Sequence, residues 1–313
     1  MTDRVSGAKV RYVKVAADRA GQRLDNFLLG QLGGVPRSLV YRLVRTGQVR
    51  VNGSRAKPMQ KLRTGDEIRI PPVATDAPQH RQVPDSLVES IRQKIIHQDR
   101  DIVVIDKPAG LAVHGGSGLS FGLMDAINVL DKSWKSVHRL DRPTSGLLLL
   151  GCHHQAVVQL QRAFAERQVE KRYLTLLRGE LPEDRLRVDV PLKKIRDGSG
   201  QRRVIAADDG QTAVSEFRCL ERLPGFSFAE VQIETGRTHQ IRAHARFIGH
   251  PVAGDERYDD APGPAGLKRL FLHAHFLRLR WPEDRVFSAP LPIELGQLVE
   301  RLREGQQPPT QQN

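Results

Sequence analysis

The apolar residues of the first part of the chain follow two different periods. Between residues 24 and 32, and again between 39 and 44, they fall three to four positions apart, which predicts two amphipathic helices. The stretch VRVNG at 49–53 predicts a strand that enters an Asn-Gly turn, and DEIRI at 66–70 predicts another strand. With a further short strand over 10–15, the pattern predicts a small unit of two helices and a β-hairpin.

Beyond the first hundred residues, short apolar runs rich in β-branched and aromatic residues dominate the chain. A few stretches between these runs have a helical period, notably 154–168 and 238–248. Strand runs interrupted by few helices predict an α+β fold with a mixed, mostly antiparallel central sheet. The expected strands are 101–106, 111–114, 147–152, 172–177, 214–220, 226–235 and 270–280.

Changes in composition divide the chain into five segments. Residues 73–90 contain two prolines and little apolar periodicity, so we expect them to form a linker. The polar tail at 305–313, GQQPPTQQN, is expected to be disordered. The remaining predicted segments are an N-terminal lead-in at 1–20, the compact unit at 21–72 and a larger domain at 91–304.

The charge of the chain points to an anionic partner. Its 49 lysines and arginines exceed its 36 acidic residues by 13, and more than half of this excess lies in 21–72, with ten basic and three acidic residues. A charged helix face is often merely solvated, but one this unbalanced is typical of a surface that contacts phosphates. The residues there that we expect to bind a nucleic acid are Arg37, Arg42, Arg45, Arg50 and Lys57.

Several classes of protein find no support in the sequence. The two cysteines lie far apart, and no apolar run is long enough to cross a bilayer or to act as a signal peptide, so we expect a cytoplasmic protein without membrane contact. Motifs for a phosphate-binding loop, a nucleophile elbow and a zinc helix are missing. His273 and His275 share one face of a predicted strand but lack a third metal ligand. We therefore expect chemistry without a cofactor or a metal.

One polar cluster precedes the most apolar strand of the chain. In VHRLDRPTSGLLLL, Asp141 lies between Arg139 and Arg142, and the leucines of 147–150 predict a strand buried on both faces. Loops that leave such rigid strands often carry catalytic residues. The simpler alternative is an Arg–Asp ion pair that holds the loop in place.

Two further clusters contain candidate site residues. In TGRTHQIRAHARFIGHP, basic side chains that include Arg237, His239 and Arg242 lie at or near the start of a predicted helix, where anions are attracted. This face either contacts an anion such as a nucleic-acid phosphate, through Arg237 and His239 in particular, or is an ordinary solvated surface. In EKRYLTLLRGEL, Tyr173 begins an apolar strand and, taken alone, is a core tyrosine.

These clusters together resemble a known family. HRLDRPTSG, KRYLTLLRG and TGRTHQIRAH, with DKPAGLAVHGG at 106–116, resemble the four motifs of the RluA-type pseudouridine synthases. The first unit resembles the S4-like RNA-binding domain that precedes the catalytic domain in some of these enzymes. The resemblance covers residues 10 to 305, and Pro143 fills a variable position of the most specific motif. The resemblance implies no site residue within 255–269.

The resemblance implies an activity and a role for each site residue. The activity is the isomerisation of uridine to pseudouridine in 23S ribosomal RNA, which breaks the C1′–N1 bond and joins C1′ to C5 without a cofactor. Asp141 is implied as the catalytic carboxylate, either as a nucleophile or as a base that abstracts a ribose proton. Arg242 is implied as its partner, Tyr173 as the residue that stacks on the target base and assists its deprotonation at C5, and Arg139 as a side chain that enters the RNA stack.

Three alternatives remain open. The same chemistry on transfer RNA is the nearest, and an RNA-binding ribosome-assembly factor without catalysis belongs to a different class. A methyltransferase would need a Gly-rich cofactor loop after the first strand of its catalytic domain, which DIVVIDKPAG does not supply. We expect large-subunit ribosomal RNA as the partner, no protein partner, and a monomer.

Overall fold

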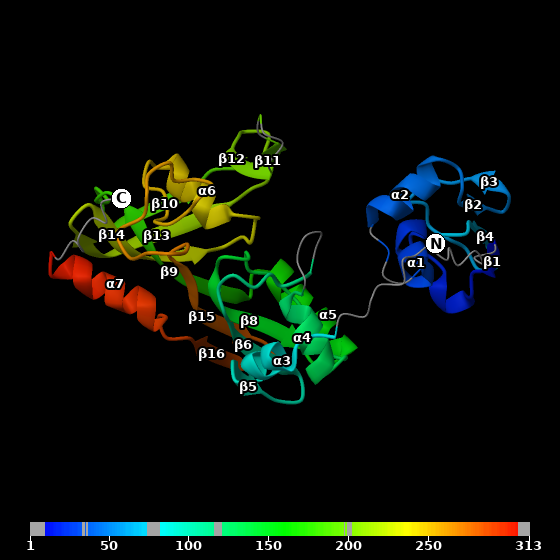
Figure 1. Cartoon of the computed structure of the whole chain (residues 1–313), viewed down its shortest axis with the longest axis horizontal. Helices are drawn as coiled ribbons and strands as arrows, with labels where there is room; N and C mark the ends of the chain where they lie inside the picture. Colours follow the sequence, from blue (N-terminus) through cyan, green and yellow to red (C-terminus); the bar gives the residue numbers. More distant parts are fainter. Residues whose placement is uncertain are drawn as a thin grey trace, which may run out of the picture. The chain divides into compact units, whose positions relative to one another are not determined.

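The computed structural model describes residues 10–32, 35, 37–73, 82–115, 121–196, 198 and 202–305. The chain separates into two compact units, 1–82 and 83–313, and both are shown in Figure 1. Among the described residues, no helix has both the length and the apolar character needed to span a membrane.

The first unit is a four-stranded antiparallel sheet with two helices. Its elements are β1 (Arg11–Lys14), the short 3₁₀ helix η1 (Ala17–Arg19), α1 (Leu24–Leu32), α2 (Arg37–Arg45), β2 (Arg50–Val51), β3 (Ser54–Arg55) and β4 (Glu67–Ile70). The strand order is β1-β4-β2-β3, and the apolar faces of both helices share one core with the sheet. Asn52 and Gly53 both have positive φ, as an Asn-Gly hairpin turn requires. The predicted helices and hairpin are confirmed.

Residues 1–9 of the predicted lead-in lie outside the described residues, and its remainder belongs to the first unit. β1 pairs along its whole length with β4, and Val15 is buried in the core of the first unit. The predicted strand over 10–15 is thus confirmed, whereas the predicted boundary at residue 20 is wrong because this strand completes the sheet and the core of the first unit.

The second unit contains most of the chain. Its elements are α3 (Asp85–Arg92), β5 (Ile95–Gln98), β6 (Ile102–Lys107), α4 (Leu123–Leu130), β7 (Lys135–Ser136), β8 (Ser145–Gly151), α5 (His154–Ala165), β9 (Val169–Arg178), β10 (Arg185–Asp189), β11 (Leu192–Arg196), β12 (Arg202–Ala206), β13 (Val214–Leu223), β14 (Phe226–Ile233), α6 (Gln240–Phe247), β15 (Leu272–Arg280), β16 (Asp284–Ser288) and α7 (Ile293–Arg303). The large sheet has the order β10-β13-β14-β9-β15-β8-β6-β5, with β16 on β15 and β7 on β8. Among the described strands only β15 and β8 pair in parallel, so the predicted mixed, mostly antiparallel sheet is confirmed.

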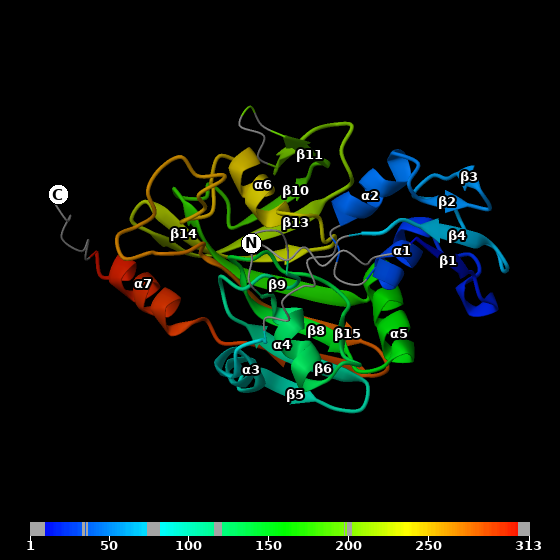
Figure 2. The same cartoon turned by 45° about the vertical axis from the view of Figure 1, so that its right-hand side comes forward.

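Helices cover both faces of this sheet. α3, α4 and α6 pack on one face, and α5 and α7 pack on the other, as Figures 1 and 2 show for α6 and α7. β8 lies in the middle of the sheet and is buried along its whole length. Leu148 and Leu150 face the first layer, whereas Leu147 and Leu149 face the second. The predicted strand buried on both faces is therefore confirmed.

The predicted linker contains structure that the sequence pattern did not indicate. The second unit begins at residue 83, and α3 buries Val88 and Ile91 against its core. α3 has only eight residues, fewer than the stretch over which a helical period can be recognised. The part of the predicted linker from 83 to 90 thus belongs to the second unit. The predicted tail beyond residue 305 lies outside the described residues.

The strand predicted over 111–114 is wrong. The carbonyl groups of Ala112 and Val113 instead accept hydrogen bonds from the backbone N–H groups of Leu123 and Met124, at 2.8 and 2.9 Å. These two donors belong to the first turn of α4, where backbone N–H groups have no partner within the helix. Residues 111–113 therefore cap a helix rather than pair in a sheet.

Candidate active site

The backbone places Asp141 in a tight turn just before the central strand. The N–H of Thr144 donates to the carbonyl of Asp141 at 3.1 Å, and β8 begins at the next residue. Gly146 has a φ of +109°, and a Cβ at this position would lie 2.2 Å from the carbonyl oxygen of Ala274 on β15. The glycine of the TSG sequence therefore permits the close approach of β8 and β15, and this approach fixes the end of the Asp141 turn.

Ser145 anchors the same turn through its side chain. Its Oγ accepts from Arg269 Nη2 at 2.6 Å and lies 2.9 Å from His273 Nδ1. His273 Nε2 lies 3.3 Å from the carbonyl of Ala289, and burial lowers the pKa of His273 to about 4. The imidazole is therefore neutral at neutral pH, with Nε2–H as donor and Nδ1 as acceptor for the hydroxyl.

The two histidines considered as metal ligands do not converge. His273 binds Ser145, whereas His275 Nε2 lies 3.0 Å from Glu230 Oε1. The strand β15 has a bulge between Ala274 and Phe276, which separates the surroundings of the two side chains. In the part of the chain that the structure describes, no three His, Cys, Asp or Glu residues are arranged to hold a metal ion.

Arg142 holds the turn but does not pair with Asp141. Its Nε donates to the carbonyl of Gly110 at 2.9 Å, and the Gly110 N–H donates back to the Arg142 carbonyl at 2.8 Å. Lys107 Nζ donates to the carbonyl oxygens of Leu111 at 2.9 Å and Arg142 at 3.4 Å, and burial lowers its pKa to about 7. The alternative of an ion pair between Asp141 and its neighbour Arg142 is therefore wrong.

The first residue of the HRLD sequence has a structural contact. His138 Nε2 accepts from the backbone N–H of Leu149 at 2.9 Å, and its ring stacks on Phe164 at 4.8 Å between centroids. Burial, assisted by the positive charge of Lys171, lowers the pKa of His138 to about 3. His138 is therefore a neutral hydrogen-bond acceptor that ties the segment before Asp141 to β8.

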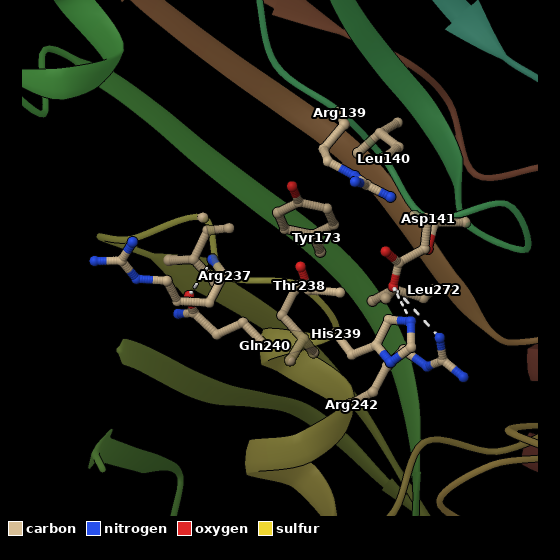
Figure 3. A pocket seen from close by; sticks show the side chains of 14 residues that line it. Arg139, Leu140, Asp141, Tyr173, Arg237, Thr238, His239, Gln240, Arg242 and Leu272 are labelled. Carbon is tan, nitrogen blue, oxygen red and sulfur yellow. Dashed lines mark hydrogen bonds and ion pairs between the residues drawn. The ribbon is translucent and has the colours of Figure 1, made fainter. Parts of the chain in front are cut away.

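Asp141 meets a basic partner from far along the sequence. Arg242 Nη1 on α6 lies 3.4 Å from Asp141 Oδ2 (Figure 3). The same guanidinium is held in two-point contact by the buried Asp255, with Nε to Oδ2 at 2.7 Å and Nη2 to Oδ1 at 2.6 Å. Its face also lies 5.1 Å from the ring of Tyr258. Arg242 is thus fixed by Asp255 and presents its remaining nitrogen to Asp141.

His239 approaches the same carboxylate oxygen. Its Nε2 lies 3.8 Å from Asp141 Oδ2, and its Nδ1 lies 3.0 Å from the hydroxyl of Tyr258 (Figure 3 shows the first contact). The Tyr258 hydroxyl accepts from the N–H of Val204 at 2.9 Å, so its own proton is available for Nδ1. Burial lowers the pKa of His239. This pattern gives a neutral imidazole whose Nε2–H faces Asp141.

The backbone at His239 is in an unusual conformation. With φ at 53° and ψ at 22° it adopts the left-handed region just before α6, and no side-chain capping bond compensates. Such strain at a non-glycine residue persists where the surrounding structure enforces it, and it is frequent at functional sites. Here it places the imidazole and the Arg242 guanidinium on the same side of Asp141.

Tyr173 and Arg139 line the pocket beside this carboxylate. Figure 3 shows the Tyr173 ring between Arg139 and Thr238, close to Asp141. Burial, together with the negative charge of Asp141, raises the pKa of Tyr173 well above its usual value. Arg139 is exposed and also lines an adjoining groove of about 890 Å³ that contains Asp141 and Arg242.

The predicted RNA-binding residues are placed in two separate regions. Arg237 is exposed near Tyr173, and its Nε donates to the carbonyl of Thr212 at 3.0 Å. His239 instead faces Asp141, as described above. The predicted residues of the first unit all have exposed side chains on α2 and the segments that follow it; they are Arg37, Arg42, Arg45, Arg50 and Lys57.

The sequence did not indicate the residues of the 255–269 segment. Asp255 and Tyr258 support Arg242 and His239, and Asp259 binds Arg178 in two-point contact, with distances between 2.7 and 3.1 Å. The segment has no apolar period and belongs to no helix or strand. Its acidic residues gave the only available signal, and acidic residues in a loop are common on any surface.

Comparison with known proteins assigns this chain to a family. Residues 101–247 match the model of the RNA pseudouridylate synthase family, and residues 22–68 match the S4 domain. The human RNA pseudouridylate synthase domain containing 4 has a similar structure, with a TM-score of 0.60 at 27% identity over 70% of this chain and 96% of that chain. The chain belongs to the RNA pseudouridylate synthase family and carries an S4 domain at its N-terminal side.

Particular relatives match along almost the whole chain. The ribosomal large subunit pseudouridine synthase C of Haemophilus ducreyi is 41% identical over 96% of this chain and 98% of that protein. The protein of the same name from Escherichia coli is 41% identical over 94% of this chain and 97% of that protein. The predicted family and the predicted RNA-binding domain are confirmed.

Proposed function

We propose that this chain converts specific uridines of large-subunit ribosomal RNA to pseudouridine, as a monomer in the cytoplasm. The observation that carries the proposal is the juxtaposition of Asp141, Arg242 and Tyr173 in one pocket of an RNA pseudouridylate synthase fold. The substrate class is taken from the relatives named ribosomal large subunit pseudouridine synthase C, which this chain matches over nearly its full length.

In this proposal Asp141 is the acting carboxylate. Among the described residues, both contacts to its side chain, from Arg242 and His239, are made to Oδ2. Oδ1 is therefore the oxygen available to the ribose or the base. The C1′–N1 bond breaks and a C1′–C5 bond forms, while C5 loses a proton and N1 gains one. The reaction is balanced without an external group, and an ionised carboxylate serves it either as nucleophile or as base.

Tyr173 contributes as a neutral phenol. Because burial and the nearby Asp141 both raise the pKa of its hydroxyl, a phenolate at neutral pH is strongly disfavoured. We therefore assign to Tyr173 the stacking of its ring on the target base, and removal of the C5 proton by a tyrosinate is the less favoured role. The family resemblance implied both stacking and assistance of C5 deprotonation for Tyr173, and this assignment favours stacking.

Arg139 is proposed to support base flipping. A uridine inside a helix must leave the stack to reach Asp141, which costs a few kcal/mol. Arg139 is exposed, lines the pocket and precedes Asp141 by two residues. A guanidinium placed in the vacated position offsets part of the cost of flipping.

The first unit is proposed to bind RNA through phosphate contacts. Its five predicted cations are exposed, and the S4 domain match covers most of this unit. Phosphate contacts release counterions and carry little sequence information. The second unit then selects the uridine.

The test is the release of tritium from C5-labelled uridine in unmodified large-subunit ribosomal RNA. The wild type is expected to release tritium and Asp141→Asn to release none, because the amide cannot act as a nucleophile or a base. Mapping the products identifies the modified positions. Release from transfer RNA alone would redirect the proposal to that substrate. Tight binding without release from either RNA would favour the ribosome-assembly factor.

A further inference from the structure

A second pocket lies close to the active site but does not contain Asp141. It has a volume of about 230 Å³ and is formed by α6, by β12 and by residues 257–260. Its buried floor consists of Val204, Ala243 and Tyr258.

The walls of this pocket expose apolar surface to solvent. Phe247, at the end of α6, is 55% exposed, and Ile205 on β12 is 40% exposed. Large apolar side chains that stay exposed around a cavity often mark a binding site. An aromatic ring beside aliphatic groups provides a flat surface on which a planar ring can stack.

The rim of the pocket is positively charged. Arg203, Arg246 and Arg257 line it, together with the single carboxylate of Asp260. Arg246 Nη2 contacts Asp260 at 2.8 Å, but both side chains are more than half exposed, so this pair is readily rearranged. An anionic ligand with a planar apolar part matches the combination of guanidinium groups and an aromatic ring.

The pocket is adjacent to the catalytic groups. Tyr258 forms part of its floor and contacts His239, whose other ring nitrogen faces Asp141. Arg257 lines both this pocket and the groove that contains Asp141. The second pocket therefore adjoins the groove that contains Asp141.

We propose that this pocket binds one unpaired nucleotide of the same RNA substrate, with its base against Phe247 and its phosphate among the arginines. The inference rests on the proposed function and adds to it a second point of recognition. Recognition of RNA by sequence relies on unstacked bases bound to aromatic or guanidinium surfaces. The enzyme would thus select a uridine by the position of a neighbouring unpaired base as well as by the uridine itself.

The test uses full-length Phe247→Ala and a fragment of large-subunit RNA that the wild type modifies. Removal of the stacking surface is expected to raise KM roughly 5- to 100-fold, the range found for loss of one base–aromatic stack, with kcat unchanged. The matched control is Val158→Ala, which truncates a side chain on α5 that is 47% exposed and lines neither cavity. Thermal unfolding checks that both variants are folded.

A second measurement identifies the nucleotide. A set of fragments, each with one abasic nucleotide, is compared with wild type and Phe247→Ala. At the position that occupies the pocket, base removal should raise KM for the wild type and leave KM of the variant unchanged. The proposal fails if Phe247→Ala behaves like Val158→Ala, or if every abasic position affects both enzymes equally. If the wild type releases no tritium, the proposed function fails, and the same comparison is made by the Kd of the fragments.

Discussion

The two-point contact between Arg242 and Asp255 offers a way to measure separately how Asp255 affects the stability of the protein and the rate of the reaction. In Asp255→Asn the amide occupies the same space, but it removes the negative charge that faces the guanidinium at 2.6 and 2.7 Å. Breaking a buried ion pair by removing one partner costs about 3–5 kcal/mol. Since Arg242 retains Asp141 as a partner, we expect a loss near the lower end, about 3 kcal/mol.

The same change is expected to move Arg242. Its Nη1 now lies 3.4 Å from Asp141 Oδ2, whereas a charge-assisted hydrogen bond has a length of about 2.8 Å. Without Asp255, Arg242 can close this gap and draw Oδ2 away from its present position by roughly half an ångström. A displacement of 1 Å at a reacting group can lower the rate about 100-fold, so we expect kcat to fall about 10-fold.

Asp259→Asn is the matched control for this prediction. Asp259 belongs to the same segment, is almost fully buried, and holds Arg178 in the same two-point geometry without contact to Arg242. Urea unfolding, followed by the fluorescence of the two tryptophans of the second unit, measures stability, and single-turnover tritium release measures the rate. We expect both variants to lose stability and only Asp255→Asn to lose rate. An equal loss of rate in both variants, or none in Asp255→Asn, would refute the positioning role of Asp255.

Three further predictions follow from other contacts. The pKa of His138 is about 3 in the folded protein and about 6.5 in the unfolded chain, so its contribution to stability is complete above pH 6.5 and is lost as the pH falls from there. In His138→Gln, the plot of the free energy of unfolding against pH should therefore be flatter in this range, by up to about 1.4 kcal/mol per pH unit. Urea unfolding at a series of pH values measures this slope. Gly146→Ala places a Cβ against the Ala274 backbone at a φ of +109°, so unfolding should show a loss of about 4 kcal/mol or more, and a loss below 1 kcal/mol would contradict the packing described. Arg42→Gln combined with Arg45→Gln should reduce the slope of log K against log salt by about 2, whereas an unchanged slope would exclude both from phosphate contacts.

The elements that the sequence predicted well are those whose apolar pattern matches their burial. β8 is buried on both faces and was expected from its continuous leucines, and α2 has one buried and one charged face. α4 was missed because its short, mostly apolar sequence has no clear helical period. α7 was not predicted either, because it contains Gly296, which lowers its helix propensity. β11 and β12 form a separate two-stranded sheet, and their charged residues stand next to one another instead of alternating with apolar ones, so no strand period revealed them.

The candidate site was predicted only in part, because some of its residues lie in a segment without a recognisable sequence pattern. Asp141, Arg139, Tyr173 and Arg242 lie in motifs that the family resemblance identified, and the structure brings them to one pocket. The side chains that hold them come from a segment with no pattern of its own. Asp255, for example, reaches Arg242 through the path of a loop, and loop paths depend on tertiary contacts that no local sequence rule contains.

The attachment of the Asp141 turn to β8 determines whether the enzyme or the RNA changes conformation when the reactive geometry forms. The turn is held by strand pairing, by Gly146 against β15 and by buried polar contacts, all of which lie at the buried strand β8 inside the large sheet. Local opening of such a region requires nearly global unfolding. The enzyme is therefore a rigid template, and it is the RNA that must deform. The temperature dependence of turnover on structured RNA should then follow the melting of the RNA around the target uridine, not a motion of the protein.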